Sequence, residues 1–172
     1  MDGSPKTRAV RTLLLSIVLA GCASTAGGPP AATPITAADR SAPAAAGQAA
    51  ALSVVVYRSP TCACCSEHET YLREAGVEVQ AVVDPDIERV KKSFGIPREM
   101  YSCHTAEIAG YFVEGHVPLA AIEKLVAEKP DLDGIALPGM PPGAPGMAGV
   151  QEGALEVFAI RDGKVVGLFG EY

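Results

Sequence analysis

The sequence contains no tryptophan, and aromatic residues make up only 5% of it. It also has no glycine-rich phosphate loop, no nucleophile-elbow serine and no internal repeat, so the usual signatures of nucleotide-binding enzymes, serine hydrolases and repeat proteins are missing. Basic residues are few, with 14 Lys and Arg against 20 Asp and Glu. An acidic chain without a basic patch is poorly suited to phosphate backbones, which excludes nucleic-acid binding. The chemistry must therefore lie with the cysteines and the few histidines and methionines.

A long hydrophobic run is also missing at the N-terminus. The apolar residues 13–19 are far fewer than the roughly 20 that a membrane-spanning helix needs. They follow Lys6, Arg8 and Arg11, which is the charged-then-apolar order of a secretory signal. We therefore predict export from the cytoplasm.

The signal ends in Leu19-Ala20-Gly21-Cys22, which resembles the lipobox of bacterial lipoproteins. In that motif the cysteine is acylated and becomes the new N-terminus, so we predict a lipoprotein signal peptide over residues 1–21 and a lipid anchor at Cys22. Ala23 follows where an aspartate would favour the inner membrane, so the outer membrane is the expected location. The other four cysteines then work in the periplasm, where thiols are oxidised, metal-bound or redox-active.

The next segment has too few large apolar side chains to fold. Residues 22–51 are mostly Ala, Pro, Gly, Ser and Thr, and only Asp39 and Arg40 are charged. We predict a flexible linker here, because such a composition does not offset the entropy cost of ordering. Residues 52–172 remain, enough for one small domain with one core.

The remaining sequence alternates strand and helix patterns. We predict strands over 52–57, 77–83, 105–109 and 111–113, helices over 64–75 and after Asp84-Pro85, and a further helix opened by Pro118. This β-α-β-α-β-β-α order predicts an α/β, thioredoxin-like domain with a cysteine cluster between its first strand and first helix.

A C-terminal extension follows this domain. Residues 134–153 are rich in Gly and Pro and carry Met140 and Met147, which predicts a long functional loop. Residues 155–160 and 164–169 then flank Asp162-Gly163, the signature of a β-hairpin.

Three thiols fall within four residues in Cys62-Ala63-Cys64-Cys65. At the start of a helix, free backbone N–H groups and the helix dipole favour thiolates. Soft thiolates select Cu(I), Zn(II) or iron–sulfur units. Zinc sites usually pair two separated Cys-x-x-Cys units, or one such unit with histidine, so the crowded spacing favours several bridged Cu(I) ions.

Further ligand candidates lie elsewhere in the chain. We expect Cys103 to supply a fourth sulfur from the entrance to the third strand, which leaves His104 the weaker candidate because successive strand residues point to opposite faces. His116 precedes a helix and is a candidate ligand. His68 lies on the same helical side as Cys65, but no other sequence feature indicates that it binds metal. Thioethers suit Cu(I), so Met147 and, less strongly, Met140 are candidates, and we expect Met100 to be a packing residue.

Two other functions stay open. Cys62 and Cys65 form a Cys-x-x-Cys pair, so the domain is also a candidate thiol–disulfide oxidoreductase, although Cys64 and Cys103 would trap mixed disulfides. Alternatively, disulfides staple a domain without catalytic function, for example by pairing Cys62 or Cys65 with Cys103. Neither alternative requires a thiol triplet, so metal binding remains the leading hypothesis.

Several motifs recur together in one known family. They are Ser59-Pro60-Thr61-Cys62-Ala63-Cys64-Cys65, Ser102-Cys103-His104-Thr105-Ala106, Gly110-Tyr111, Glu114-Gly115-His116-Val117-Pro118, Pro138-Gly139-Met140-Pro141 and Pro145-Gly146-Met147. Residues 54–169 thereby resemble the CopG-type periplasmic copper-resistance proteins. The resemblance implies a thioredoxin-like domain whose C-terminal extension helps to bind copper. It also implies a role in copper redox chemistry and detoxification.

By motif position, the resemblance assigns copper to Cys62, Cys64, Cys65 and Cys103, with Met147 and His116 as further positions. The sequence departs from the family at Ala63, where Gly is frequent, and at Ala144, where Ser is common. His68 stands where the family often has an aromatic residue, and Tyr71 stands where it often has His, so His68 inherits no family function.

The combined prediction is a lipid-anchored periplasmic protein that binds copper. Clustered thiolates would hold the metal as Cu(I), with more than one copper ion in the site. A cycle between Cu(I) and Cu(II) would make it a copper-dependent oxidoreductase, with Cys62 and Cys65 as redox candidates and no catalytic residue assigned. The expected partners are copper ions, the membrane, and a copper-export or redox protein.

Overall fold

The computed structural model describes residues 52–172. The predicted signal peptide, the lipid anchor at Cys22 and the linker lie outside the described residues. Within residues 52–172, no helix combines the length and the hydropathy required to span a bilayer.

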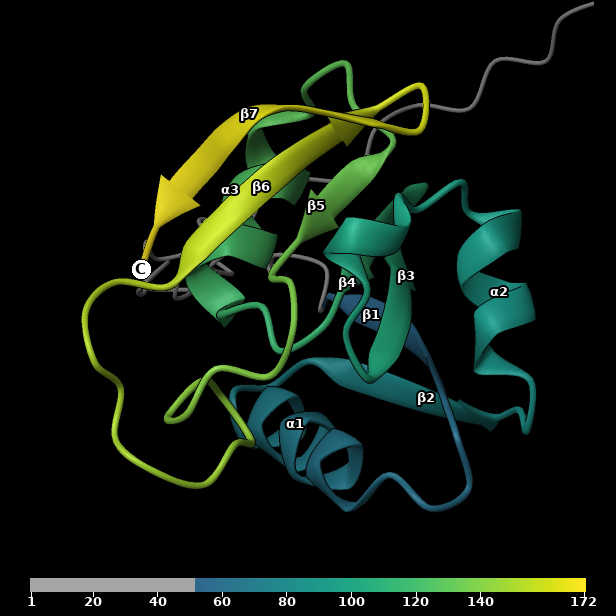
Figure 1. Cartoon of the computed structure of the whole chain (residues 1–172). Coiled ribbons are helices and arrows are strands. Elements are labelled where there is room, and N and C mark those ends of the chain that lie inside the picture. The colour runs from purple at the N-terminus through teal and green to yellow at the C-terminus, as the bar shows by residue number, and fades with distance from the viewer. Residues whose placement is uncertain (1–51) are drawn as a thin grey trace, which may run out of the picture. The chain divides into compact units, whose positions relative to one another are not determined.

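The predicted order of elements is present. In chain order they are β1 (Ser53–Arg58), α1 (Ala63–Glu74), β2 (Glu78–Val83), α2 (Ile87–Ser93), the 3-10 helix η1 (Arg98–Met100), β3 (His104–Ile108), β4 (Tyr111–Glu114), α3 (Leu119–Glu128), β5 (Gly134–Ala136), β6 (Glu156–Arg161) and β7 (Lys164–Glu171) (Figure 1). The α/β fold class is therefore confirmed, together with a C-terminal extension made of a loop and a hairpin.

All strands of residues 52–172 belong to one sheet, in the order β2-β1-β3-β4-β5-β6-β7. β1 pairs with β2 in parallel and with β3 in antiparallel orientation, and β3 is antiparallel to β4. The extension joins this sheet directly, because β5 pairs in parallel with β4 and β6 and β7 follow as antiparallel neighbours.

The predicted loop over residues 134–153 was wrong at its start, because Gly134–Ala136 forms β5. Three residues are too short for a periodic pattern, although Ile135 is fully buried. Gly134 is required by close packing, since a Cβ at this position would collide with the carbonyl oxygen of Phe112. The long loop therefore begins only after β5, and Figure 1 shows it passing beside α1 before it returns to β6.

The two faces of the sheet carry separate apolar clusters. The larger cluster joins the sheet to α1 through Leu72 and to α3 through Ile122 and Leu125. The smaller cluster contains Phe112 and packs against Met100. Its strand residues are neighbours of those in the larger cluster, so their side chains point to the opposite face of the sheet. The expectation that Met100 is a packing residue is thus confirmed.

A charged pair is buried between α2 and β4. Lys91 Nζ lies 2.5 Å from Glu114 Oε1, and the two side chains are 2% and 0% exposed. Burial raises the pKa of Glu114, and the Lys91 charge acts in the opposite direction. The carboxylate also accepts hydrogen bonds from Thr105 Oγ1 and from the backbone N–H of Ser102, each at 2.6 Å. A buried charge needs such partners, because water no longer solvates it.

Lys91→Met is expected to lower the free energy of unfolding by about 3–5 kcal/mol, since it leaves the Glu114 carboxylate buried and unpaired. Adding Glu114→Gln should restore part of this loss by removing the charge. Urea denaturation followed by circular dichroism measures both effects. Lys92→Met is the matched control, because the side chain of Lys92 is 63% exposed and such changes usually stay within about 0.5 kcal/mol. Equal losses for Lys91→Met and Lys92→Met would contradict the prediction.

Candidate metal centre

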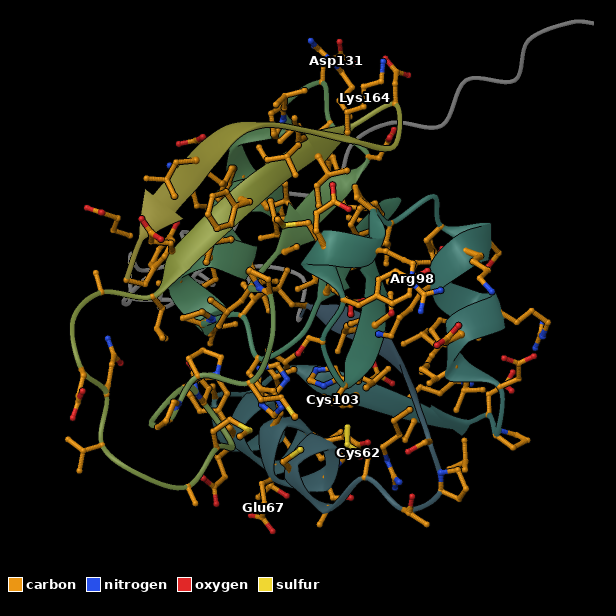
Figure 2. All side chains as sticks on the ribbon, in the orientation of Figure 1. Cys62, Glu67, Arg98, Cys103, Asp131 and Lys164 are labelled. Atoms are coloured by element: carbon orange, nitrogen blue, oxygen red, sulfur yellow. A yellow bond between two sulfur atoms is a disulfide. The ribbon has the colours of Figure 1, made fainter. Side chains whose placement is uncertain are left out.

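Sheet topology brings three chain segments to one end of the domain. β1 and β3 are antiparallel with Arg58 opposite His104, and β3 and β4 are antiparallel with Thr105 opposite Glu114. The residues after β1, before β3 and after β4 therefore meet. Figure 2 shows the Cys62 and Cys103 side chains near the start of α1, away from the hairpin turn of β6 and β7.

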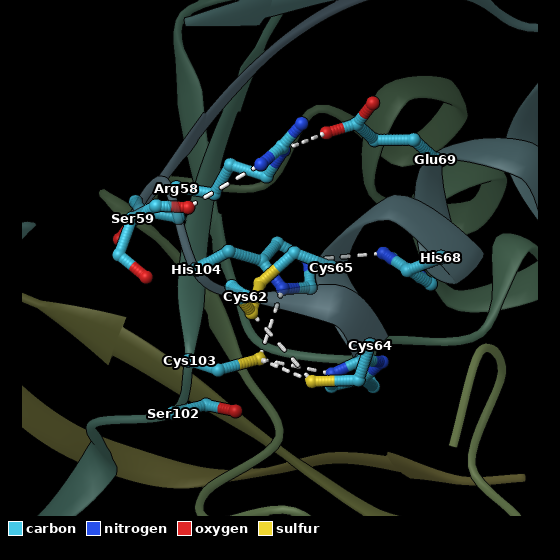
Figure 3. The surroundings of a disulfide bond; sticks show 12 residues. Arg58, Ser59, Cys62, Cys64, Cys65, His68, Glu69, Ser102, Cys103 and His104 are labelled. Atoms are coloured by element: carbon cyan, nitrogen blue, oxygen red, sulfur yellow. Dashed lines mark hydrogen bonds and ion pairs between the residues drawn. A yellow bond between two sulfur atoms is a disulfide. The ribbon is translucent and has the colours of Figure 1, made fainter. Parts of the chain in front are cut away.

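The cysteine triplet lies at the N-terminus of α1. Cys62 is the N-cap residue, and its backbone N–H donates to the Ser59 carbonyl in the turn that follows β1. One helical turn brings Cys65 back beside Cys62, and the two form a disulfide with a Cα–Cα distance of 5.4 Å (Figure 3). Cys65 is fully buried, whereas Cys64 keeps a free thiol.

A buried carboxylate fixes α1 against the end of β1. Glu69 Oε1 lies 2.7 Å from Arg58 Nε (Figure 3), and Glu69 Oε2 lies 3.1 Å from Arg73 Nη2. Both oxygens of the 5% exposed side chain are thus paired. This contact sets the position of the cysteine triplet relative to the sheet.

Cys103 joins the triplet from the other segment. Its Sγ lies 3.8 Å from Cys64 Sγ, which in turn lies 3.6 Å from Cys62 Sγ. The four sulfur atoms of Cys62, Cys64, Cys65 and Cys103 all lie within 4.8 Å of one another. We call these residues the sulfur group.

The three histidines of the chain form a second group beside the first. One ring nitrogen from each of His68, His104 and His116 lies within 4.8 Å of the others, and all three residues are at most 1% exposed. We call them the imidazole group. Its centre is held by a 2.9 Å contact between His68 Nδ1 and His104 Nε2 (Figure 3).

Cys103 connects the two groups. Its Sγ lies 2.9 Å from His116 Nε2 and 3.3 Å from His104 Nδ1. Only one of Cys103 and His104 was expected to face the site if the strand already ran through Cys103. This condition is not met, because β3 begins at His104 and Cys103 still lies in a bend. Strand alternation therefore does not apply between them.

His68 lies closer to the candidate site than its sequence pattern indicates. Its position three residues after Cys65 placed it on the correct side of α1, but the partner 36 residues further along the chain was not visible in the sequence. His68 Nε2 also donates to the Val117 carbonyl at 3.1 Å. Both contacts depend on the packing of α1 against β3 and on the turn after β4.

The long loop between β5 and β6, which carries Met140 and Met147, reaches the imidazole group. His116 Nδ1 donates to the Pro145 carbonyl at 2.7 Å. The neighbouring Gly146 has a φ of +79° and packs so closely on the His68 backbone that a Cβ would collide with it. Met147 is partly buried against the larger core cluster, whereas Met140 is 55% exposed. The ligand roles of both methionines stay predictions.

Burial controls the titration of these residues. It lowers the pKa of His68 to about 4, holds that of His104 well below its ordinary value and also lowers that of His116. For the Cys103 thiol, burial and then the neighbouring Cys64 raise the pKa to about 12. At neutral pH the imidazoles are thus uncharged, and a metal that binds Cys103 must displace its proton.

The metal-free protein is expected to lose stability as the pH falls from about 6.5 to 4. In this window the unfolded chain binds protons that the folded imidazole group rejects. His68→Gln should reduce the pH slope of the unfolding free energy by up to about 1.4 kcal/mol per pH unit, the effect of one proton. Denaturant unfolding at several pH values measures the slope.

Tyr71→Phe is the control for this experiment. Tyr71 stacks on His68 with ring centroids 5.8 Å apart, and this substitution leaves all three imidazoles in place. It should shift the whole curve without changing its slope. Identical slopes for wild type and His68→Gln would show that burial of His68 does not drive the acid sensitivity.

Known proteins resemble this arrangement. Residues 100–147 match the family model described as "Protein of unknown function, DUF411". The search of the curated proteins gave no match. Two solved structures, titled "Copper resistance protein copG- Form 2" and "Copper resistance protein copG- Form 1", are each 43% identical to this chain with a TM-score of 0.65. In both cases the match covers 71% of this chain and 98% of the other.

The matched region therefore spans nearly the whole length of the chain in those two structures. The motif positions of the sulfur group and of His116 lie together at one end of the sheet. On this combination of identity and coverage, the chain belongs to the CopG family of copper resistance proteins.

Proposed function

We propose that the protein binds copper as Cu(I) through the thiolates of the sulfur group. The observation that carries this proposal is the convergence of four cysteine sulfurs and three uncharged imidazoles at one partly buried site. Kinship with copper resistance proteins supports the choice of metal. His116 and, more weakly, His104 are proposed nitrogen ligands, and Met147 and Met140 are proposed thioether ligands.

The donor set fits Cu(I) better than the harder divalent ions. Thiolate and thioether ligands select Cu(I), while imidazole accepts both copper and zinc. Cys64 Sγ lies within 3.8 Å of both Cys62 Sγ and Cys103 Sγ, so a thiolate there is placed to bridge two ions. We therefore propose more than one copper ion for the fully reduced protein.

The disulfide limits how much metal the protein holds. While Cys62 and Cys65 are joined, Cys64 and Cys103 offer the only free thiols of residues 52–172. Reduction by an external dithiol breaks the S–S bond through a mixed disulfide and yields two further thiols, while the dithiol is oxidised to its own disulfide. The full sulfur group is then available, so copper loading follows the redox state of the site.

We further propose that this domain works in the bacterial periplasm, with residues 1–21 removed, Cys22 lipidated in the outer membrane and residues 22–51 serving as a flexible linker. The charged-then-apolar signal and the lipobox-like cysteine support this location. A thioredoxin-like metal-binding domain would then extend into the periplasm and exchange copper or electrons with an export or redox partner.

Protein purified anaerobically from copper-supplemented cells should contain at least stoichiometric copper, measured by mass spectrometry of the metal. Cys62→Ser with Cys65→Ser is expected to remove at least half of this load, because two of four sulfur donors are lost. Met100→Leu is the matched control, since Met100 packs against the smaller core cluster and should leave the load unchanged.

Two results would count against the copper function. One is wild-type protein that carries only trace copper after reduction and anaerobic titration. The other is an unchanged copper load in the double cysteine variant.

The disulfide favours one second function, that of a thiol–disulfide oxidoreductase. Cys62 is the N-cap of α1, where the helix dipole stabilises a thiolate. However, Cys64 Sγ lies 3.6 Å from Cys62 Sγ and is placed to intercept mixed disulfides. The residue before β3 is Cys103 rather than the proline that dithiol enzymes of this fold keep there.

Metal-free, reduced protein is expected to show no insulin-reducing activity above a dithiothreitol blank. Cys64→Ser tests the reason, since removal of the intercepting thiol should raise any residual turnover. Robust insulin reduction by the wild type would establish the oxidoreductase as the better assignment.

A further inference from the structure

The imidazole group has a feature that metal binding by the sulfur group does not require. Every ring nitrogen of its three histidines has a partner in the described structure. Two of these partners are backbone carbonyls, which accept hydrogen bonds and never donate them. The position of each imidazole proton follows from this restriction.

The chain of contacts starts at Val117. Because its carbonyl only accepts, His68 Nε2 carries a hydrogen. A neutral imidazole has one N–H, so His68 Nδ1 presents a lone pair. This lone pair points at His104 Nε2, 2.9 Å away.

His104 must then carry its hydrogen on Nε2 in order to donate to His68. Its Nδ1 is left with a free lone pair, and that atom lies 3.3 Å from Cys103 Sγ. Without an acceptor at position 68, either tautomer of His104 would be available. His68 therefore decides which nitrogen of His104 faces the sulfur.

His116 reaches the same arrangement by a different route. Its Nδ1 donates to the Pro145 carbonyl, so the lone pair is on Nε2, 2.9 Å from Cys103 Sγ. Two imidazole lone pairs thus converge on one thiol. Together with Cys103 they form a nitrogen–sulfur donor set at the edge of the sulfur group.

We propose that His68 is a positioning residue that fixes His104 as an Nδ1 ligand of the copper site. This inference rests on the proposed copper function. Metal-ligating histidines commonly donate their second ring N–H to a partner that fixes tautomer and orientation. His68 takes that part here.

The surroundings of His68 support a fixed partner over a metal ligand. Its ring stacks on Tyr71 at an interplanar angle of 17°. Its backbone is in close contact with Gly146, and the residue is 1% exposed. To bind a metal itself, His68 would have to give up the hydrogen bond with either His104 or Val117.

Long-range ¹H–¹⁵N correlation spectra of the metal-free, reduced full chain test the proposal directly, because they identify the protonated ring nitrogen. We expect His104 to be protonated on Nε2 in the wild type. His68→Leu removes the acceptor and should produce the Nδ1–H form or a mixture. His68→Gln keeps one acceptor and one donor and should retain the wild-type form, as should Tyr71→Phe.

Anaerobic titration with Cu(I) against a chelator gives the functional readout. His68→Leu should bind copper about 10- to 100-fold more weakly than the wild type, the usual effect of losing such a partner. X-ray absorption should detect fewer nitrogen neighbours. His68→Gln should stay close to the wild type in both measurements.

An Nδ1–H form of His104 in the wild type would overturn the proposal, even if His68→Leu does not fold. Equal copper affinity and nitrogen count in wild type and His68→Leu would also overturn it. Failure of the wild type to bind copper would instead refute the proposed function. The tautomer assignment would still be decided by the metal-free spectra.

Discussion

The buried carboxylate of Glu114 is the contact on which this end of the domain depends. It forms an ion pair with Lys91 on α2 and accepts hydrogen bonds from Thr105 on β3 and from the backbone N–H of Ser102. These three partners belong to three different segments of the chain. Ser102 Oγ in turn donates to the carbonyl of Gly139 in the C-terminal extension. The backbone next to Cys103 is thereby held from several sides at once. Preorganisation of this kind allows donor atoms to meet a metal without a large ordering cost.

Most of the helices and strands could be predicted from local sequence patterns. Strands and helices with clear periodicity and turn residues, such as the hairpin around Asp162-Gly163, lie within one or two residues of their predicted limits. β5 was missed because its pairing with β4 and β6, rather than its three-residue sequence, makes it a strand. Local patterns define elements well and non-local pairing poorly.

The same distinction applies to the site. The triplet and Cys103 were found because thiol spacing carries chemical meaning by itself, and the structure brings them together. The place of His68 could not be found in that way. Its partners are 36 and 49 residues distant in sequence, so their distances exist only after folding. The pairing of Cys62 with Cys65, rather than with Cys103, was likewise one of several arrangements that the sequence allowed.

The extension after α3 is an integral part of the sheet. β5 covers the edge of β4 that α3 leaves open, so a chain cut after residue 133 would present that edge, with its unpaired backbone groups, to other molecules. It would also lack the Pro145 carbonyl that orients His116. A shortened version of this domain would therefore have an aggregation-prone sheet edge and an incorrectly oriented imidazole in its donor set. Relatives that keep the full site should therefore keep both the loop and the hairpin.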